Sequence, residues 1–361
     1  MRFQEIKLWL GLLLAVLLAG CASPGIPLPP SLELARPVND LRAVRKGDKV
    51  RLTWTIPTQT TDHQKLKHGG MVEVCRTLGS TITACGAPVA RIPFQPPSRD
   101  ANANQDQASY TDQLGHGEQS SPTAEFVYAV NILNPYNRSA GLSNQIQVAA
   151  ATTLPPPSEF HAQLTPEGVQ LSWSAVTPQV PDVRFVYRVY RREQGSSKDV
   201  IAGEVPISNE ESLNLLDHGF EWEKTYDYRA TVVTIIAVPN GAERQVEGED
   251  TPSVRVVAHD VFPPAVPAGL QAVFSGPGQK PFIDLVWTPN SEPDLAGYNV
   301  YRCDEGREEA VKLNSDLIKS PAFRDTEVAP GHRYVYSISA GDVRGNESPR
   351  SEEAAESVPA Q

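Results

Sequence analysis

The sequence predicts an all-β protein built from tandem two-layer β-sandwiches. A short alternating segment that ends in tryptophan occurs three times, as VRLTW (50–54), VQLSW (169–173) and IDLVW (283–287). Positions 1, 3 and 5 of each segment are apolar, which is the period-2 pattern of a strand with one buried face. The tryptophans lie 119 and 114 residues apart, the length of a small domain. The 32 prolines and 25 glycines among the 361 residues also favour short strands and turns over long helices.

Each tryptophan segment is flanked by matching segments. A proline-led strand precedes it, and a second alternating strand follows it, as in YRVYR (187–191) and YNVYR (298–302). Later in each copy an aspartate closes a strand, and an aromatic-rich strand comes next. These aspartates are Asp112, Asp217 and Asp325. Because they recur in register, we expect them to have a repeated structural role and not a catalytic one.

With these segments in view, the three copies resemble fibronectin type III domains, which are immunoglobulin-like β-sandwiches. The third copy is the most similar, through PNSEPDLAGYNVYR (289–302) and GDVRGNESPRS (341–351). The resemblance implies seven strands in two sheets for each copy. The domain ranges expected from it are 37–151, 156–259 and 264–357.

Five aromatic residues are expected in the cores of these sandwiches. The three repeated tryptophans share strand parity with valine and leucine, so we place their indoles between the sheets; they are Trp54, Trp173 and Trp287. The resemblance implies that Tyr226 and Tyr334 form tyrosine corners, in which the hydroxyl turns back to the preceding backbone. The first copy has Phe126 at this position, which has no hydroxyl group.

The first twenty residues (1–20) predict a lipoprotein signal peptide. Arg2 and Lys7 supply positive charge ahead of an apolar stretch of about eleven residues, which is too short to span a bilayer comfortably. The LAGC that follows resembles the lipobox of bacterial lipoproteins. This resemblance implies cleavage before Cys21 and a diacylglycerol on its thiol. The alternative is an ordinary secretory signal with an incidental cysteine.

The segment 21–36 is rich in proline and predicts an extended tether. The residue after the cysteine is Ala22, which resembles the pattern of lipoproteins sorted to the outer membrane. We therefore expect a protein of the cell envelope that is held to the membrane by its lipid and faces either the periplasm or the medium.

The sequence carries no recognisable catalytic motif. His63 and His68 share one loop, which is better explained as a polar surface loop than as a metal site. HExxH, GxSxG and phosphate-binding glycine motifs are absent from the sequence. The net charge of −11 disfavours nucleic acid as a partner. We expect no enzyme activity, no catalytic residue, no cofactor and no metal.

The remaining cysteines predict one disulfide bond. Cys75 ends a strand, and Cys85 follows a segment that can fold back as a hairpin, so the two are expected to pair in an oxidising compartment. Cys303 is then left over, either as a free thiol or in an intermolecular disulfide.

The first copy contains a long polar segment, 93–125, rich in Asn, Gln, Ser and Asp. Its composition is typical of an elongated loop inserted in the sandwich. The alternative is a loop that binds a partner.

The function expected from these features is that of a non-catalytic, lipid-anchored envelope protein. It would act as a scaffold, a spacer or an adhesion and protein-interaction module, with an unknown protein or polysaccharide as its partner. The alternative is an accessory carbohydrate-binding module that serves secreted hydrolases. That alternative requires exposed aromatic side chains, for which the candidates are Trp222, Tyr136 and Tyr190.

Overall fold

A computed structural model describes most of the chain after the tether. The described residues are 32–97, 106–115, 123–175, 183–207, 212–237, 243–276, 278–307 and 309–360. Over these ranges the regular structure consists of β-strands, which confirms the predicted all-β, fibronectin type III-like fold class. No helix in these ranges has the length and apolar character needed to cross a membrane.

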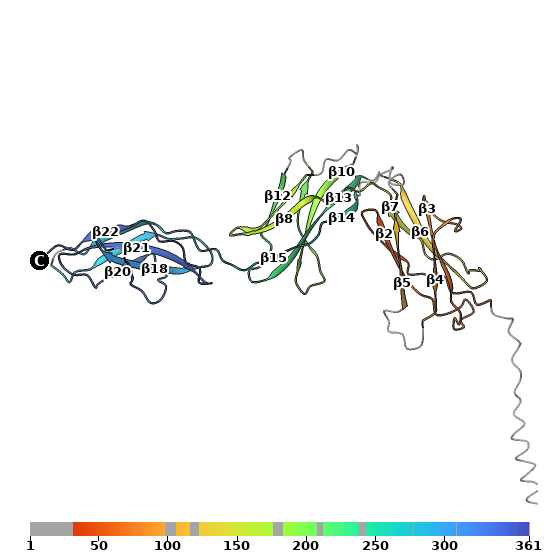
Figure 1. The fold of residues 1–361 in the computed structure, drawn as a ribbon, viewed down its shortest axis with the longest axis horizontal. Helices are drawn as coiled ribbons and strands as arrows, with labels where there is room; N and C mark the ends of the chain where they lie inside the picture. The colour runs from red at the N-terminus through yellow and green to blue at the C-terminus, as the bar shows by residue number, and fades with distance from the viewer. Residues whose placement is uncertain are drawn as a thin grey trace, which may run out of the picture. The chain divides into compact units, whose positions relative to one another are not determined.

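The first sandwich packs a three-stranded sheet against a four-stranded sheet (red to yellow in Figure 1). The strand order of the smaller sheet is β1-β2-β5, and its strands are β1 (Arg42–Lys46), β2 (Lys49–Thr55) and β5 (Gln107–Gln113). The order of the larger sheet is β4-β3-β6-β7, and its strands are β3 (Gly70–Leu78), β4 (Pro88–Phe94), β6 (Glu125–Leu133) and β7 (Ile146–Ala149). Neighbouring strands in both sheets are antiparallel. Seven strands in two sheets are what the resemblance implied for this copy.

Two further pairs of sheets follow along the chain, the second with three and five strands and the third with three and four. The second pair of sheets comprises β12-β9-β8 and β11-β10-β13-β14, and β15 also pairs with β13. Its strands are β8 (Ser158–Thr165), β9 (Gly168–Ser174), β10 (Arg184–Glu193), β11 (Val200–Pro206), β12 (Ser212–Asp217), β13 (Thr225–Ala237), β14 (Glu243–Asp250) and β15 (Val254–Val257). The third pair comprises β16-β17-β20 and β19-β18-β21-β22. Its strands are β16 (Ala268–Phe274), β17 (Ile283–Thr288), β18 (Leu295–Asp304), β19 (Val311–Lys312), β20 (Ala322–Asp325), β21 (Arg333–Asp342) and β22 (Ala354–Ser357).

The three repeated tryptophans lie inside the sandwiches. Trp54, Trp173 and Trp287 are only 2%, 2% and 5% exposed. Each occupies the inward parity of its strand, because the alternating partners along the strand, such as Val50 and Leu52 in β2, are also fully buried. Burying a side chain of this size stabilises the fold by about 3 kcal/mol or more.

The polar range 93–125 is not one continuous loop. Its residues 107–113 form strand β5, which pairs with β2 along its whole length. Asp112, which was expected to close a strand, is the buried residue near the end of β5. The segments 98–105 and 116–122 of the range lie outside the described residues.

Each predicted domain range contains one of the three pairs of sheets. The contacts within the chain, however, divide it into two compact units. The first unit comprises Met1–Pro155, Val180–Phe185 and Val233–Glu249, and the second comprises the remaining residues. Within the first unit, Ile236 and Val246 from the β13–β14 hairpin form an apolar cluster with Ala149 and Ala151. This contact buries Ile236 near the end of β13, where the strand no longer alternates between buried and exposed residues. The exact domain boundaries stay predictions.

Candidate functional site

The three recurring aspartates each hold a buried three-residue cluster. In every sandwich the aspartate Oδ2 accepts one hydrogen bond from an arginine of the neighbouring sheet and one from a tyrosine hydroxyl. The clusters are Arg76–Asp112–Tyr128, Arg191–Asp217–Tyr228 and Arg302–Asp325–Tyr336, with arginine N to aspartate O distances of 2.7, 2.5 and 2.7 Å. Burial and the adjacent carboxylate raise the pKa of each tyrosine well above its ordinary value. Because the clusters are buried and repeated, they join the two sheets structurally.

Tyr226 and Tyr334 lie next to these clusters, each at the start of its strand. The Tyr226 hydroxyl accepts a hydrogen bond from the backbone N–H of Glu221, and the Tyr334 hydroxyl accepts one from Ala329, both at 3.0 Å. These bonds are those of a tyrosine corner. In the first sandwich Phe126 occupies the same place, and its ring still packs against the cluster arginine, as the corner tyrosines do.

The cysteines take separate positions. Cys75 and Cys85 are joined by a disulfide bond within the first sandwich. Cys303 is a half-exposed free thiol at the end of β18. Cys21 lies outside the described residues, so its lipidation stays a prediction.

The three candidate aromatic residues have different surroundings. Tyr136 is 82% exposed on the loop after β6, where its backbone N–H is held by the side chain of Asn134. The ring of Tyr190 is covered by the guanidinium of Arg229, whose carbon lies 4.5 Å from the ring centroid. Trp222 is half-buried and lines a pocket.

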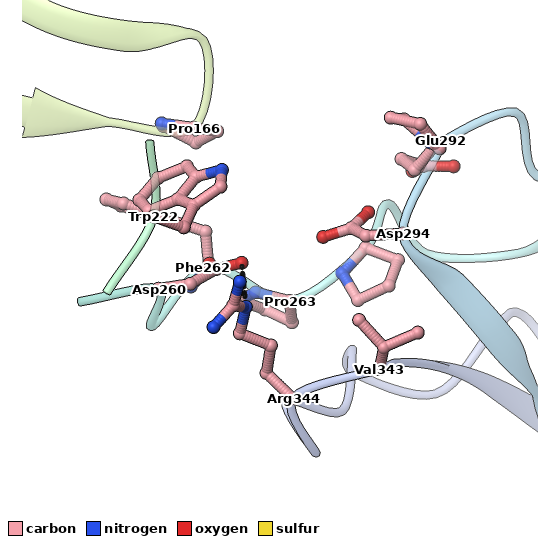
Figure 2. A pocket seen from close by; sticks show the side chains of 11 residues that line it. Pro166, Trp222, Asp260, Phe262, Pro263, Glu292, Asp294, Val343 and Arg344 are labelled. Atoms are coloured by element: carbon pink, nitrogen blue, oxygen red, sulfur yellow. Dashed lines mark hydrogen bonds and ion pairs between the residues drawn. The ribbon is translucent and has the colours of Figure 1, made fainter. Parts of the chain in front are cut away.

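The pocket in the second unit has a volume of about 340 Å³ and two chemically different walls (Figure 2). Trp222 and Pro166 lie on one side, with Phe262 behind them, and Glu292 and Asp294 lie on the opposite side. Arg344 and Val343 reach the space from below in this view. The complete lining is Pro166, Trp222, Asp260, Phe262, Pro263, Pro264, Glu292, Pro293, Asp294, Val343 and Arg344.

Trp222 is presented by the turn that precedes β13. The edge of the Phe220 ring packs on its indole with centroids 4.9 Å apart, and Phe262 packs at 6.1 Å. The next residue, Glu223, has a left-handed backbone (φ 64°), which closes the turn sharply. A hydrogen bond with His259 and one from the Asp260 N–H hold the pKa of the Glu223 carboxyl below its ordinary value. The turn is therefore fastened to the segment after β15.

Arg344 is held from two directions. Its backbone N–H donates to Asp342 Oδ1 at 2.8 Å, as part of the turn after β21. Its guanidinium donates to Glu223 Oε1 at 2.8 Å and lies 3.6 Å from Asp260 Oδ2. These ion pairs fix the guanidinium at the edge of the pocket.

Three carboxylates gather at the pocket, and two of them, those of Asp260 and Asp294, line it. One oxygen each from Asp260, Asp294 and Asp342 lies within 4.8 Å of the others, and Asp260 and Asp342 are only 4% and 3% exposed. Burial disfavours the charge of Asp342, but hydrogen bonds from Asn346 and the Arg344 N–H outweigh it and lower the pKa of this carboxyl. Such oxygens are the ligands that hard cations such as Ca²⁺ prefer. The nearby guanidinium of Arg344 already supplies positive charge, and we assign no metal here.

The pocket's composition defines what it can do. An aromatic wall opposite a carboxylate wall binds a ligand that has one apolar face and several hydrogen-bond donors. The residues do not form a nucleophile–base pair of the kind used in covalent catalysis. Sequence reasoning singled out Trp222 but did not connect it with Phe262, Asp294 or Arg344. One signal was available for Asp294 and Arg344. The turn around residue 290 precedes β18, the turn around residue 344 follows β21, and these two strands are adjacent in one sheet.

Comparisons with known proteins find similarity to segments of an amylopullulanase and of an exoglucanase. It is 38% identical over 91 residues to an amylopullulanase of Thermoanaerobacterium saccharolyticum, covering 25% of this chain and 6% of that protein. It is 24% identical over 242 residues to exoglucanase B of Cellulomonas fimi, covering 63% of this chain and 20% of that protein. The chain thus spans at most a fifth of these relatives. No protein-family model matches the chain.

Two solved structures are also similar. The FN1–FN3 domains of chicken CNTN1 match 90% of this chain and 99% of that structure at 15% identity, with a TM-score of 0.27. An Fn3-like protein of Clostridium thermocellum matches 27% of this chain and 96% of that structure at 32% identity, with a TM-score of 0.23. The structural neighbours are therefore proteins with fibronectin type III domains.

Proposed function

We propose that this chain is a non-catalytic accessory protein of the cell envelope, held to the membrane by a lipid on Cys21. In this role the sandwiches act as a scaffold or spacer that holds binding surfaces away from the membrane. The observation that carries the proposal is the repeated buried cluster around Asp112, Asp217 and Asp325. The titratable groups that recur in the three copies are bonded to one another inside the sandwiches, where they have a structural role. The proline-rich segment 21–36 supplies an extended link to the membrane.

Lipid labelling in cells tests the anchor. Cells that express the chain are grown with labelled palmitate, and the purified protein is expected to carry the label and to sediment with membranes. The variant Cys21→Ser is expected to lose the label and to leave the membrane fraction. Variant Cys303→Ser is the matched control and should keep both properties. An unlabelled wild-type protein in the soluble fraction would refute the anchor.

A second candidate function is that of an accessory carbohydrate-binding module. It is favoured by the similarity to segments of an amylopullulanase and an exoglucanase, whose names specify polysaccharide degradation. The aromatic and carboxylate walls of the pocket at Trp222 also support it. The test is retention of the full chain on insoluble starch and on cellulose, with albumin as the control for non-specific adsorption. Recovery of the chain only in the unbound fraction for both polysaccharides would refute this candidate.

A further inference from the structure

We propose that the pocket around Trp222 binds a short segment of a neutral polysaccharide, with one sugar ring lying against the indole. This inference rests on the second candidate function and assigns it to a particular site. The site is made by five segments of the second unit: the β8–β9 turn, the turn before β13, the segment after β15, the turn before β18 and the turn after β21.

The apolar wall provides the surface for the sugar ring. A pyranose ring carries C–H groups on its faces, and such groups pack favourably on the electron-rich face of an aromatic ring. The rings of Phe220 and Phe262 pack on Trp222, and Pro166 lies beside it, so these contacts hold the indole in its orientation without a ligand. A braced ring loses little conformational freedom on binding, which favours affinity.

The polar wall provides acceptors for sugar hydroxyl groups. The carboxylate of Asp294 points into the space opposite Trp222, and within the described part of the chain the structure records no hydrogen bond to its oxygens (Figure 2). Glu292 is positioned by the backbone N–H groups of Ala265 and Ser291, at 2.7 and 2.9 Å. Hydrogen bonds from hydroxyl groups to carboxylates are stronger than those between neutral groups.

Charge and size select the class of glycan. Asp260, Glu292 and Asp294 line the pocket, and Arg344 is the one cation among its lining residues. The surplus of negative charge repels acidic polysaccharides and phosphorylated ligands. The volume of about 340 Å³ lies at the lower end of the range for ligand pockets, so the site accepts a short segment and not a long chain.

Affinity electrophoresis of the full mature chain tests the site, with soluble starch and hydroxyethyl cellulose as the probes. We expect one of the two to retard the wild-type protein. Trp222→Ala should weaken binding at least tenfold, and Asp294→Asn should weaken it severalfold while leaving the indole wall intact. Tyr136→Ala removes an exposed aromatic residue outside the pocket and should bind as the wild type does. Calorimetric melting of each variant verifies that it is folded.

The possible outcomes distinguish an error in the proposed site from an error in the proposed carbohydrate-binding function. If the wild type and Trp222→Ala are retarded equally, the site is wrong, although carbohydrate binding stands. If neither probe retards the wild type and the protein also fails on the insoluble polysaccharides, both proposals fall. If the pocket instead binds the cationic probe N-acetyl-lysine methylamide, detected as a Trp222-dependent fluorescence change, and no glycan, it is a site for basic groups and the inference is overturned.

Discussion

The first and third sandwiches each contain a buried cluster of the same kind, but they differ in the bonds that restrain the chain around it. Both clusters join an arginine, an aspartate and a tyrosine from three strands in two sheets; they are Arg76–Asp112–Tyr128 and Arg302–Asp325–Tyr336. Around its cluster, the first sandwich has a disulfide and a phenylalanine corner. The third has a tyrosine corner and a free thiol.

This difference indicates which of the three features, the cluster, the corner or the disulfide, the fold depends on. The cluster occurs in all three sandwiches, whereas the corner hydroxyl is missing from the first and the disulfide is missing from the other two. We infer that the cluster is the common bond between the sheets. The corner and the disulfide are separate local restraints on individual turns.

The largest effect should come from removing the cluster carboxylate. Asp325→Ala leaves the buried hydroxyl of Tyr336 without its acceptor and removes the carboxylate that neutralises Arg302, which keeps only its bond to the Glu327 carbonyl. We therefore expect a loss of about 3–5 kcal/mol in the free energy of unfolding of the third sandwich. Asp112→Ala should cost as much in the first. Differential scanning calorimetry of the mature chain measures both, as a shift in one transition.

The control for the cluster is Asp284→Ala in the same sandwich. Asp284 pairs with Arg324 at the surface, where the side chains are 41% and 57% exposed, so its loss should cost about 1 kcal/mol or less. Equal shifts for Asp284→Ala and Asp325→Ala would mean that the cluster does not hold the sheets together.

The disulfide should matter in the first sandwich alone. Cys75→Ala combined with Cys85→Ala opens a loop of sequence separation 10, and the chain-entropy relation gives a cost of about 2–3 kcal/mol. The expected result is a lower melting temperature for the first sandwich and an unchanged transition for the third. A matching shift on reduction of the wild type would support this, and a shift in both transitions would contradict it.

The tyrosine corner should have a smaller effect. Tyr334→Phe keeps the ring against Arg302 but removes the acceptor for the Ala329 N–H, which corresponds to about 1 kcal/mol. Tyr226→Phe should behave in the same way in the second sandwich. In calorimetry each shift is about 4–8 °C for a domain of this size. A loss as large as that of Asp325→Ala would show that the corner restrains the sandwich as strongly as the cluster does, which contradicts the inference that the corner is only a local restraint.

The sequence was sufficient for the architecture because that architecture is repeated. Three indoles at inward parity and three aspartates in register predicted the sandwiches and the structural role of the aspartates. Their partners could not be predicted, because a cluster such as Arg302–Asp325–Tyr336 joins strands that are distant along the chain. Strand β5 was predicted only in part: Asp112 was expected to close a strand, but the polar residues around it made the range 93–125 look like an inserted loop.

The pocket was less predictable than the fold. Trp222 stood out as an aromatic residue between two glutamates in a turn. Its neighbours Phe262, Asp294 and Arg344 are unremarkable in the sequence, and they meet it only through the folded turns. The spacing of residues in a single sequence does not predict which side chains from separate loops meet in the folded protein.

The smallest effect on stability is expected from the ion pairs of Asp199 in the second sandwich. They test whether partly exposed ion pairs contribute to the free energy of unfolding in addition to the buried cluster. Asp199 accepts hydrogen bonds from both Arg192 and Arg229, at 2.8 Å each. The Arg192 bonds, followed by those of Arg229, lower the pKa of the Asp199 carboxyl to about 2. Because the folded-state pKa lies below the unfolded value of about 3.9, the pair stabilises the fold fully above about pH 4.

This stabilisation should disappear as the pH falls from about 4 to about 2, where the folded-state carboxyl becomes protonated. Solvent screening limits its size to less than about 1 kcal/mol, since the Asp199 side chain is 27% exposed. Calorimetry at several pH values compares the wild type with Asp199→Asn, which keeps the shape but not the charge. We expect the two proteins to differ near neutral pH and to converge at pH 2. A difference that persists at pH 2 would show that the variant has lost packing and not an ion pair, and the exposed pair would then contribute nothing beyond the cluster.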